Sequence, residues 1–471
     1  MPTAIATYTL IKLRTKFALP ILGALICALV GCQTVQKEEP SKNNTPQKFL
    51  NETSSASQQV DNWRSLFGSP ELNTLLDRAK SNNLSLQAAW ESFQASQAIV
   101  KRFRSDGLPQ ASLGGAAERF NNSDSLAGNG VGDSGERFDA DLRAAWELDL
   151  FGRVRASVRA ATANAMADEA LYQDLMFALQ ADVALHYFQI NSLQSEIEIL
   201  ERSQETRAES LSLIEERLKA GTVSELAVAQ TASLLATAES RLFGLKRIQN
   251  GLRYSLAALL GETPDSFSLE PEALEAETPQ TPSGIPSDLL KRRPDIRRAE
   301  FQLEEARALL GVAKADFFPR ITLSGAFGFA SRDWDTLFNT SSEFDRIGPS
   351  ASLPVFQSGR LRANKAQAEA NLERQELLYR NAIIEAVTEV EILLQSIRLR
   401  ESQRQAIARS VEATENARRI SDLQYKQGIS DFITSLDAER SALDAAQQAE
   451  QVRRDQFVDT INLIRALGGS W

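Results

Sequence analysis

The feature that most constrains the fold is a change of periodicity within residues 138–156, from a strand pattern to a helix pattern. In the first part of this stretch apolar side chains alternate with mostly charged ones, and a period of two places the two sets on opposite faces of a strand. At Gly152-Arg153 the alternation stops and a helical pattern begins. The same change recurs within residues 347–363, so we expect a second joint between strand and helix at Gly359-Arg360.

Landmarks of the first half of the chain return in the second half at a nearly constant offset. The offset is 210 residues where Pro109 matches Pro319, and 207 residues where the two Gly-Arg joints match. Further glycines keep the 207-residue register, pairing Gly221 with Gly428 and Gly261 with Gly468. Landmarks that hold register in this way indicate a tandem duplication of about 208 residues. Each half is predicted to contain a helix, a β-hairpin, a long helix and a return helix.

The first repeat is expected over residues 60–261, and helical spacing in it already runs from Trp63 to Ser105. Its long helix lacks proline and carries apolar residues in steps of three and four, which is the 3.5-residue period of a coiled coil. At 1.5 Å per residue, about 67 residues of helix would extend about 100 Å. The remaining boundaries are a hairpin at about 109–150, a long helix at about 153–220, a proline-rich acidic linker at 262–286, and a second repeat at 287–471 with a hairpin at about 319–356 and a long helix at about 359–427.

The N-terminus resembles a bacterial lipoprotein signal, predicted over residues 1–31. Three basic residues precede a short apolar run, and the small residues just before Cys32 look like a lipobox. The resemblance implies cleavage before Cys32, acylation of that cysteine, and a flexible polar tether over residues 32–59. Gln33 stands where an aspartate would mark inner-membrane retention, which favours the outer membrane. The alternative is an ordinary signal peptide with a chance cysteine.

Composition argues against several classes of function. A formal net charge of -10, without a basic patch interleaved with aromatics, argues against a nucleic-acid partner. A single histidine argues against histidine-based catalysis and most zinc sites, and no phosphate loop or nucleophile motif is present. We therefore expect no catalytic residue, no metal and no cofactor. No run of about 18 apolar residues follows the signal, so we also expect no membrane-spanning helix.

The apolar face of the predicted strands needs a cover. Helices with coiled-coil spacing bury their apolar stripes on one another, so a soluble sheet would lack this cover and lipid is the favoured partner. Four strands are too few to close a barrel, and open strand edges do not occur in lipid, so oligomerisation is required. A dimer and a trimer both satisfy the even-number rule, and three copies would supply about twelve strands. Charges on the other strand face indicate a water-filled duct that the long helices continue.

Residues 285–300, IPSDLLKRRPDIRRAE, closely resemble the start of the second repeat in outer-membrane efflux proteins, the TolC-like outer-membrane factors. The resemblance covers essentially all of residues 60–471, and its other motifs are ADFFP at 315–319, LPVF at 353–356, YKQG at 425–428 and LDAER at 436–440. With the lipobox, the chain is similar to the lipoprotein branch that serves resistance-nodulation-division pumps.

The resemblance implies a mainly α protein with a small membrane β part. Three chains would form a twelve-stranded β-barrel in the outer membrane of a Gram-negative bacterium, continuous with a twelve-helix α-barrel in the periplasm. It also implies two protein partners, a periplasmic adaptor (membrane fusion protein) and an inner-membrane resistance-nodulation-division pump.

The resemblance further places a gate at the periplasmic helix tips. In the family, apolar and acidic side chains just past the second-repeat glycine constrict the duct, and the matching positions are Ile433 and Asp437, with Arg440 one turn on. The alternative for Asp437 is a solvated coiled-coil residue. Relatives often carry an aspartate six residues after the first-repeat glycine, able to bond a tyrosine of the second repeat. Here Tyr425 is present but that position is Ala227, which cannot make this bond.

These observations predict an outer-membrane exit duct that passively exports small amphiphilic compounds, such as drugs, received from a pump and its adaptor. Two alternatives stay open. One is a duct for peptides or proteins, and the other is a lipid-tethered coiled-coil scaffold.

Overall fold

The computed structural model describes residues 63–121, 134–274, 279 and 292–468. All of them lie in one compact unit, residues 46–471. The predicted signal, the tether, Cys32 and most of the C-terminal half of the linker lie outside the described residues.

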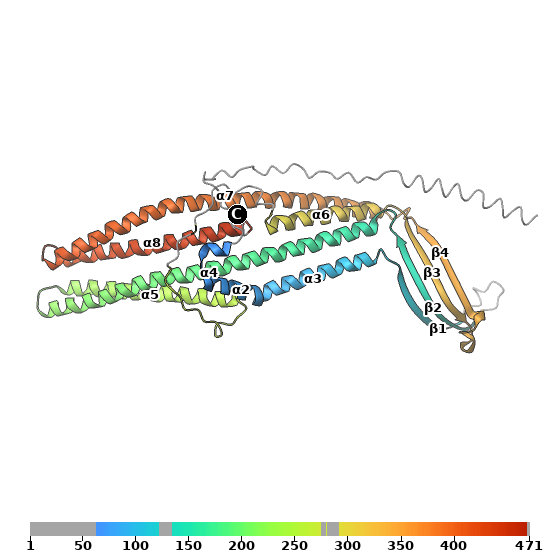
Figure 1. Cartoon of the computed structure of the whole chain (residues 1–471), viewed down its shortest axis with the longest axis horizontal. Helices are drawn as coiled ribbons and strands as arrows, with labels where there is room; N and C mark the ends of the chain where they lie inside the picture. The colour runs from blue at the N-terminus through green and yellow to red at the C-terminus, as the bar shows by residue number, and fades with distance from the viewer. Residues whose placement is uncertain (1–62, 122–133, 275–278, 280–291, 469–471) are drawn as a thin grey trace, which may run out of the picture. The chain divides into compact units, whose positions relative to one another are not determined.

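The duplication is confirmed by the lengths of the matching helices and of the first strand, which are equal in the two halves (Figure 1); only the second strand differs, with 15 residues in β2 and 10 in β4. The helix before each hairpin has 22 residues, the first strand 12, the long helix 67 and the return helix 35. The first repeat contains η1 (Trp63–Phe67), α2 (Pro70–Asn82), α3 (Leu84–Ser105), β1 (Gln110–Asn121), β2 (Ser134–Leu148), α4 (Arg153–Lys219) and α5 (Glu225–Leu259). The second contains α6 (Pro294–Ala315), β3 (Arg320–Ser331), the short η4 (Trp334–Thr336) and η5 (Thr340–Ser342), β4 (Glu343–Ser352), α7 (Arg360–Lys426) and α8 (Phe432–Ala466).

The helical spacing predicted over residues 63–105 is divided into three helices by two polar caps. The Ser69 hydroxyl accepts a hydrogen bond from the Leu72 N–H at 3.1 Å, and the Asn83 side chain accepts one from the Leu86 N–H at 2.9 Å. Serine and asparagine favour the first position of a helix because such bonds satisfy N–H groups that lack a partner within the helix. The Asn83 amide also donates to the Leu259 carbonyl at 2.9 Å, which fixes this break against α5.

The four strands form one antiparallel sheet in the order β1-β2-β3-β4. Pairing of β2 with β3 joins the hairpins of the two repeats. The predicted alternation is present, because Leu142 of β2 lies between Leu113 and Phe327 on one face, and Asp141 lies between Gly114 and Gly328 on the other. Strand β4 ends at Ser352, so the predicted hairpin limit of 356 is too late: Leu353 and Val355, expected in the strand, follow its end. Pro354 explains the difference, since proline lacks the N–H that a strand ladder needs.

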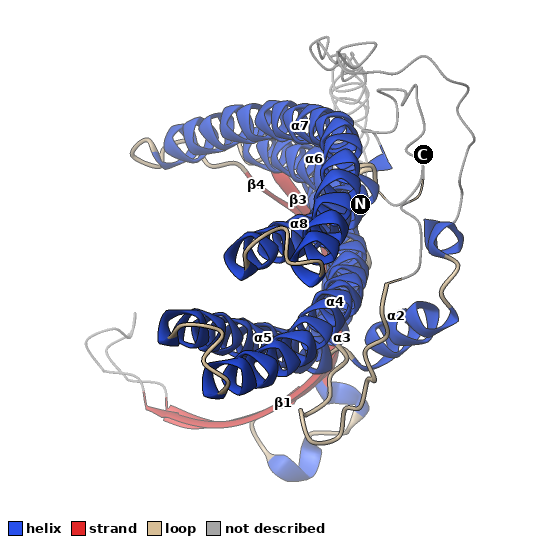
Figure 2. Ribbon diagram, turned by 90° about the vertical axis from the view of Figure 1, so that its left-hand side faces the viewer, coloured by secondary structure: helices blue, strands red, loops and turns tan. Residues whose placement is uncertain are grey.

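The long helices form a curved layer, seen nearly end-on in Figure 2. Near the strands α4 packs against α3 and α6, and α6 packs against α7; toward the far tips α4 packs against α5 and α8, and α8 packs against α7. Helix α4 is therefore internal at both levels and α7 lies at an edge. Burial agrees with these positions, because only Ala386, Val390, Leu394 and Ser421 of the 67 residues of α7 are buried.

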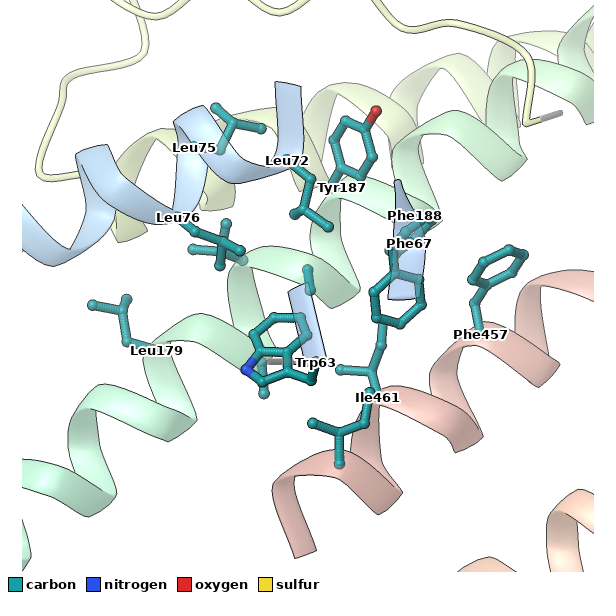
Figure 3. Close-up of a cluster of buried hydrophobic side chains, with 14 of the residues drawn as sticks. Trp63, Phe67, Leu72, Leu75, Leu76, Leu179, Tyr187, Phe188, Phe457 and Ile461 are labelled. Carbon is teal, nitrogen blue, oxygen red and sulfur yellow. The ribbon is translucent and has the colours of Figure 1, made fainter. Parts of the chain in front are cut away.

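The main hydrophobic core joins the N-terminal helices to both repeats (Figure 3). Phe67 of η1 lies 4.9 Å from Phe188 of α4, measured between ring centroids, and Phe188 stacks on Phe457 of α8 at 4.6 Å. Phe188 and Phe457 are almost fully buried, and such ring pairs add about 0.5–1.5 kcal/mol beyond their area burial. This cluster holds α4 and α8 together midway along α4.

None of the described helices has a segment that is both long and apolar enough to cross a membrane.

Candidate functional site

The first joint between strand and helix is held by two ion pairs. Gly152 adopts a left-handed conformation, φ 79°, immediately before α4. The Arg153 guanidinium donates two hydrogen bonds to the Glu147 carboxylate at the end of β2, at 2.9 and 2.7 Å. Asp149 accepts from the N–H groups of Val154 and Arg155 at 3.1 and 2.9 Å. Partial burial alone would raise the pKa of Asp149, but these hydrogen bonds and the Arg155 guanidinium outweigh it and lower that pKa.

The second joint is longer and lacks such pairs. Residues 353–359 separate β4 from α7, whereas only residues 149–152 separate β2 from α4. Gly359 is left-handed at φ 86°, as is Ser358 before it at φ 48°. The Arg360 guanidinium donates to the Gln357 side-chain carbonyl at 2.7 Å, and no carboxylate contacts it within the described part of the chain. Phe356 is 85% exposed.

The tips, where the long helices turn into the return helices, are built on Gly221 and Gly428. Both are left-handed, with φ of 70° and 74°. The following N–H groups reach back into the helix, from Thr222 to the Arg217 carbonyl at 2.9 Å and from Ile429 to the Gln424 carbonyl at 2.8 Å. Glycine is favoured there because other residues pay a steric cost in the left-handed region. The two tips are therefore structurally equivalent.

The predicted gate residues of α8 share one exposed face. Ile433, Asp437 and Arg440 follow at steps of four and three, which one side of a helix presents together. Ile433 is 44% exposed, and the Asp437 carboxylate contacts no basic side chain among the described residues. The Arg440 guanidinium pairs with Asp444 at 3.8 Å and not with Asp437. Within one chain, Asp437 is thus an exposed, unneutralised acid.

Tyr425 lies at the tip of α7, and its partner there is Arg217, which the sequence did not predict. Arg217, in the last turn of α4, donates a hydrogen bond to the Tyr425 hydroxyl. The same guanidinium lies 5.3 Å from the centre of the tyrosine ring, whose other neighbour is Phe432, also at 5.3 Å. Ala227 takes no part. A basic residue in the last turn of a helix is common because it complements the helix dipole, so nothing in the sequence singled out Arg217.

Two further ion pairs connect the repeats along α4 and α8. Arg207 lies 3.2 Å from Glu439 and donates to the Leu234 carbonyl at 2.9 Å, with its side chain only 6% exposed. Its position in the apolar stripe of α4 was a signal, because a buried guanidinium requires a partner. Glu196, 2% exposed, pairs with Arg454 at 3.0 Å. Burial raises the pKa of Glu196, and Arg454 opposes that rise only in part.

The motif that begins α6 has a structural role in the described chain. Arg293 donates to the Asp295 carboxylate and to the Ala466 carbonyl, each at 2.7 Å, and lies 2.8 Å from Glu389. It therefore ties the start of α6 to α7 and to the end of α8. A cavity of about 140 Å³ adjoins these residues. No group of three or more potential metal ligands occurs among the described residues.

Comparisons with known proteins agree with this architecture. The family model described as outer membrane efflux protein matches residues 75–262 and 285–469, which are the two repeats. The chain is 34% identical over 418 residues to the solvent efflux pump outer membrane protein SrpC of Pseudomonas putida, covering 87% of each protein. It is 31% identical over 434 residues to the pyoverdine export outer membrane protein OpmQ of Pseudomonas aeruginosa, covering 90% of each.

Two solved structures show how closely the fold is shared. The outer-membrane channel OprN aligns with a TM-score of 0.83 at 30% identity, over 89% of this chain and 97% of that one. The open state of the Neisseria gonorrhoeae MtrE outer membrane channel aligns with a TM-score of 0.84 at 28% identity, over 93% and 98%.

Proposed function

The chain belongs to the outer membrane efflux protein family, and we propose from that membership that it is the outer-membrane exit duct of a tripartite efflux pump. The observation that carries the proposal is the match of both repeats to the family, together with a two-faced sheet that leads directly into the long helices. The duct passively exports small amphiphilic compounds. Among the relatives, SrpC is named for solvent efflux and OpmQ for pyoverdine export.

We propose a homotrimer, because the sheet and the helix layer of one chain both have open edges. The sheet ends in β1 and β4, whose outer sides have no partner strand among the described residues. At each level of the helix layer four helices lie side by side, so three chains supply twelve strands and twelve helices. The apolar sheet face exposes Leu113 to 84% and Ile347 to 80%, which suits contact with lipid.

The edge helix α7 supports the same stoichiometry. It exposes large apolar side chains that soluble helices normally bury, namely Leu377, Leu378, Ile384, Ile392 and Leu399. Phe243 of α5, at the opposite edge, is 70% exposed. Contact of α7 with the opposite edge of the next chain, α3 near the strands and α5 toward the tips, would cover these surfaces.

The proposed gate lies at the tips of α7 and α8. In the trimer, three copies of Asp437 would meet near the axis, one helical turn farther from the tip than three copies of Ile433, and would form an acidic ring that favours cations. Contact of Arg217 with Tyr425 holds the tip of α7 against α4, and so replaces the carboxylate lock that Ala227 excludes.

The partners proposed at this end are a periplasmic adaptor and an inner-membrane resistance-nodulation-division pump, which supplies the energy. Acylated Cys32 adds a lipid anchor in the outer membrane.

Two measurements test the duct. A strain lacking the gene should become sensitive to amphiphilic toxic compounds and recover with the intact gene; unchanged sensitivity to all such compounds counts against efflux. The variant Cys32→Ala separates a duct from a lipid-tethered scaffold. A barrel keeps this variant in the outer membrane until detergent is added, whereas release without detergent would show that lipid was the only attachment.

A further inference from the structure

On the charged face of β2, two guanidinium groups reach solvent while the carboxylates that they pair with lie against the strands. On β2, Arg143 pairs with Asp141 at 2.7 Å and Arg137 pairs with Asp139 at 2.9 Å. The arginine side chains are 68% and 55% exposed, but the two aspartate side chains are only 5% and 16% exposed. A solute beside these two pairs therefore meets exposed guanidinium groups before it meets the paired carboxylates.

Strand register brings a second arginine beside Arg143. Ala326 of β3 pairs with Arg143 on one side and with Arg346 of β4 on the other. The two arginines thus share a row and a face of the sheet, about two strand spacings or ~10 Å apart. Within the described chain, the Arg346 guanidinium contacts the Phe344 ring, 4.9 Å from its centre, and no carboxylate.

Both guanidinium groups lean toward the same neighbouring row. Arg143 reaches Asp141 and Arg346 reaches Phe344, and these two residues lie on either side of Gly328. Gly328 brings no side chain of its own into this row, and the position that its Cβ would take is filled by β2, including Cβ of Asp141. A Cβ on Gly328 would lie 2.3 Å from the Ala140 carbonyl oxygen, so a larger residue cannot occupy this position without displacing β2.

We propose that Arg143, Gly328 and Arg346 form an oxyanion-binding subsite on the inner wall of the duct, for compounds with a carboxylate, sulfate or phosphate group. The inference rests on the proposed function, because it takes the charged face as the water-filled interior. A separation of ~10 Å does not exceed the Debye length at 0.1 M salt, so the fields of the two cations overlap above Gly328. Guanidinium groups bind oxyanions through paired N–H donors. The Arg143 guanidinium also holds Asp141 through two of its donors, at 2.9 and 2.7 Å, whereas the Arg346 guanidinium holds no carboxylate within the described chain.

Direct binding to the purified full-length protein tests the subsite without an open gate. The probe is inorganic tripolyphosphate, titrated calorimetrically at about 50 mM salt, where charge interactions are weakly screened. Arg346→Gln should weaken binding at least about tenfold, the loss expected of one charge-assisted contact, while Arg346→Lys keeps the charge and loses less. Arg119→Gln is the matched control: Arg119 lies on β1 in the alternation set of Leu113, on the apolar face.

The subsite would be refuted if neither Arg346→Gln nor Arg119→Gln weakened binding. It would also be refuted if both weakened binding equally, because that would indicate unspecific charge attraction. Retained binding in a protein that fails the efflux test would refute the duct and keep the site. Normal efflux without tripolyphosphate binding would refute the site and keep the duct.

Discussion

Replacing Arg217 by methionine should favour the open state of the proposed gate. Arg217 makes two contacts with Tyr425, one from its N–H to the hydroxyl and one from its charge to the ring. Methionine is unbranched and of similar length, so it keeps much of the packing and removes both contacts. Because these contacts join α4 to α7 at the tip, their loss should free the tip of α7 while the core around Phe457 stays intact.

The expected size of this effect follows from the two contacts. A hydrogen bond from a charged group contributes about 1.5–3 kcal/mol, and a cation over an aromatic ring about 0.5–1 kcal/mol at exposed sites. Together they stabilise the closed tip by about 2–4 kcal/mol per chain. If closed and open tips form a two-state equilibrium, even the lower figure changes it about 30-fold, since 1.4 kcal/mol corresponds to a factor of ten.

Single-channel recording in planar bilayers measures this effect as the open probability. Arg241→Met is a suitable control, because Arg241 also joins the repeats, through Asp444 at 3.2 Å, but both side chains are about half exposed. Exposed pairs contribute only about 0–1 kcal/mol, so this variant should resemble the wild type. If Arg217→Met opened no more often than Arg241→Met, the contact with Tyr425 would not hold the gate closed.

Three further predictions concern the gate, pH and the helix ends. Asp437→Ala should raise single-channel conductance by widening the constriction, and unchanged conductance would remove Asp437 from it. Burial raises the pKa of Glu196 above the usual 4.5, so the folded state binds this proton at higher pH than the unfolded chain does, and stability falls as pH rises through the raised pKa. Lowering the pH from 7.5 to 5 should therefore raise the melting temperature more for the wild type than for Glu196→Gln. Equal changes in melting temperature would refute this. Gly261→Ala should destabilise the folded protein more than Gly221→Ala does. Both glycines are left-handed, but only at Gly261 would a Cβ meet a neighbouring atom, the Asn82 carbonyl oxygen at 2.4 Å. Equal melting temperatures of the two variants would contradict this clash.

The parts of the fold that periodicity encodes were predictable from sequence. Strand alternation identified the two faces of β2, and the 3.5-residue period identified α4, because both signals depend on neighbours within a few residues. Matching glycines identified the duplication. The caps at Ser69 and Asn83 divide a helical pattern whose apolar spacing continues across them, so spacing alone did not predict those breaks.

The site was less predictable because its contacts join residues far apart in the chain. Sequence spacing placed Ile433 and Asp437 on one helix face, which the structure bears out as geometry; their role in a gate stays a prediction. The partner of Tyr425 is 208 residues away, about one repeat length, so the two residues lie at matching places in the two tips. The repeat alone does not show that these two side chains meet, because it does not say how the tips pack against each other. Likewise, the row that unites Arg143 with Arg346 depends on the register of β3 with both of its neighbours, which becomes known only when the sheet is formed.

The two repeats differ in the length of their hairpins and joints but not in the length of their long and return helices. The first residues of α3 and α6 are 210 positions apart, but the first residues of α4 and α7 are 207 apart. The second repeat is therefore three residues shorter than the first between these points. The long helices nevertheless keep the same length of 67 residues, and the return helices keep 35. Equal lengths are required if both helix tips are to reach one gate at one level, since each residue advances a helix by about 1.5 Å. The hairpins and joints carry no such requirement, so a short joint held by ion pairs at Arg153 and a longer one with an exposed Phe356 can serve the same duct.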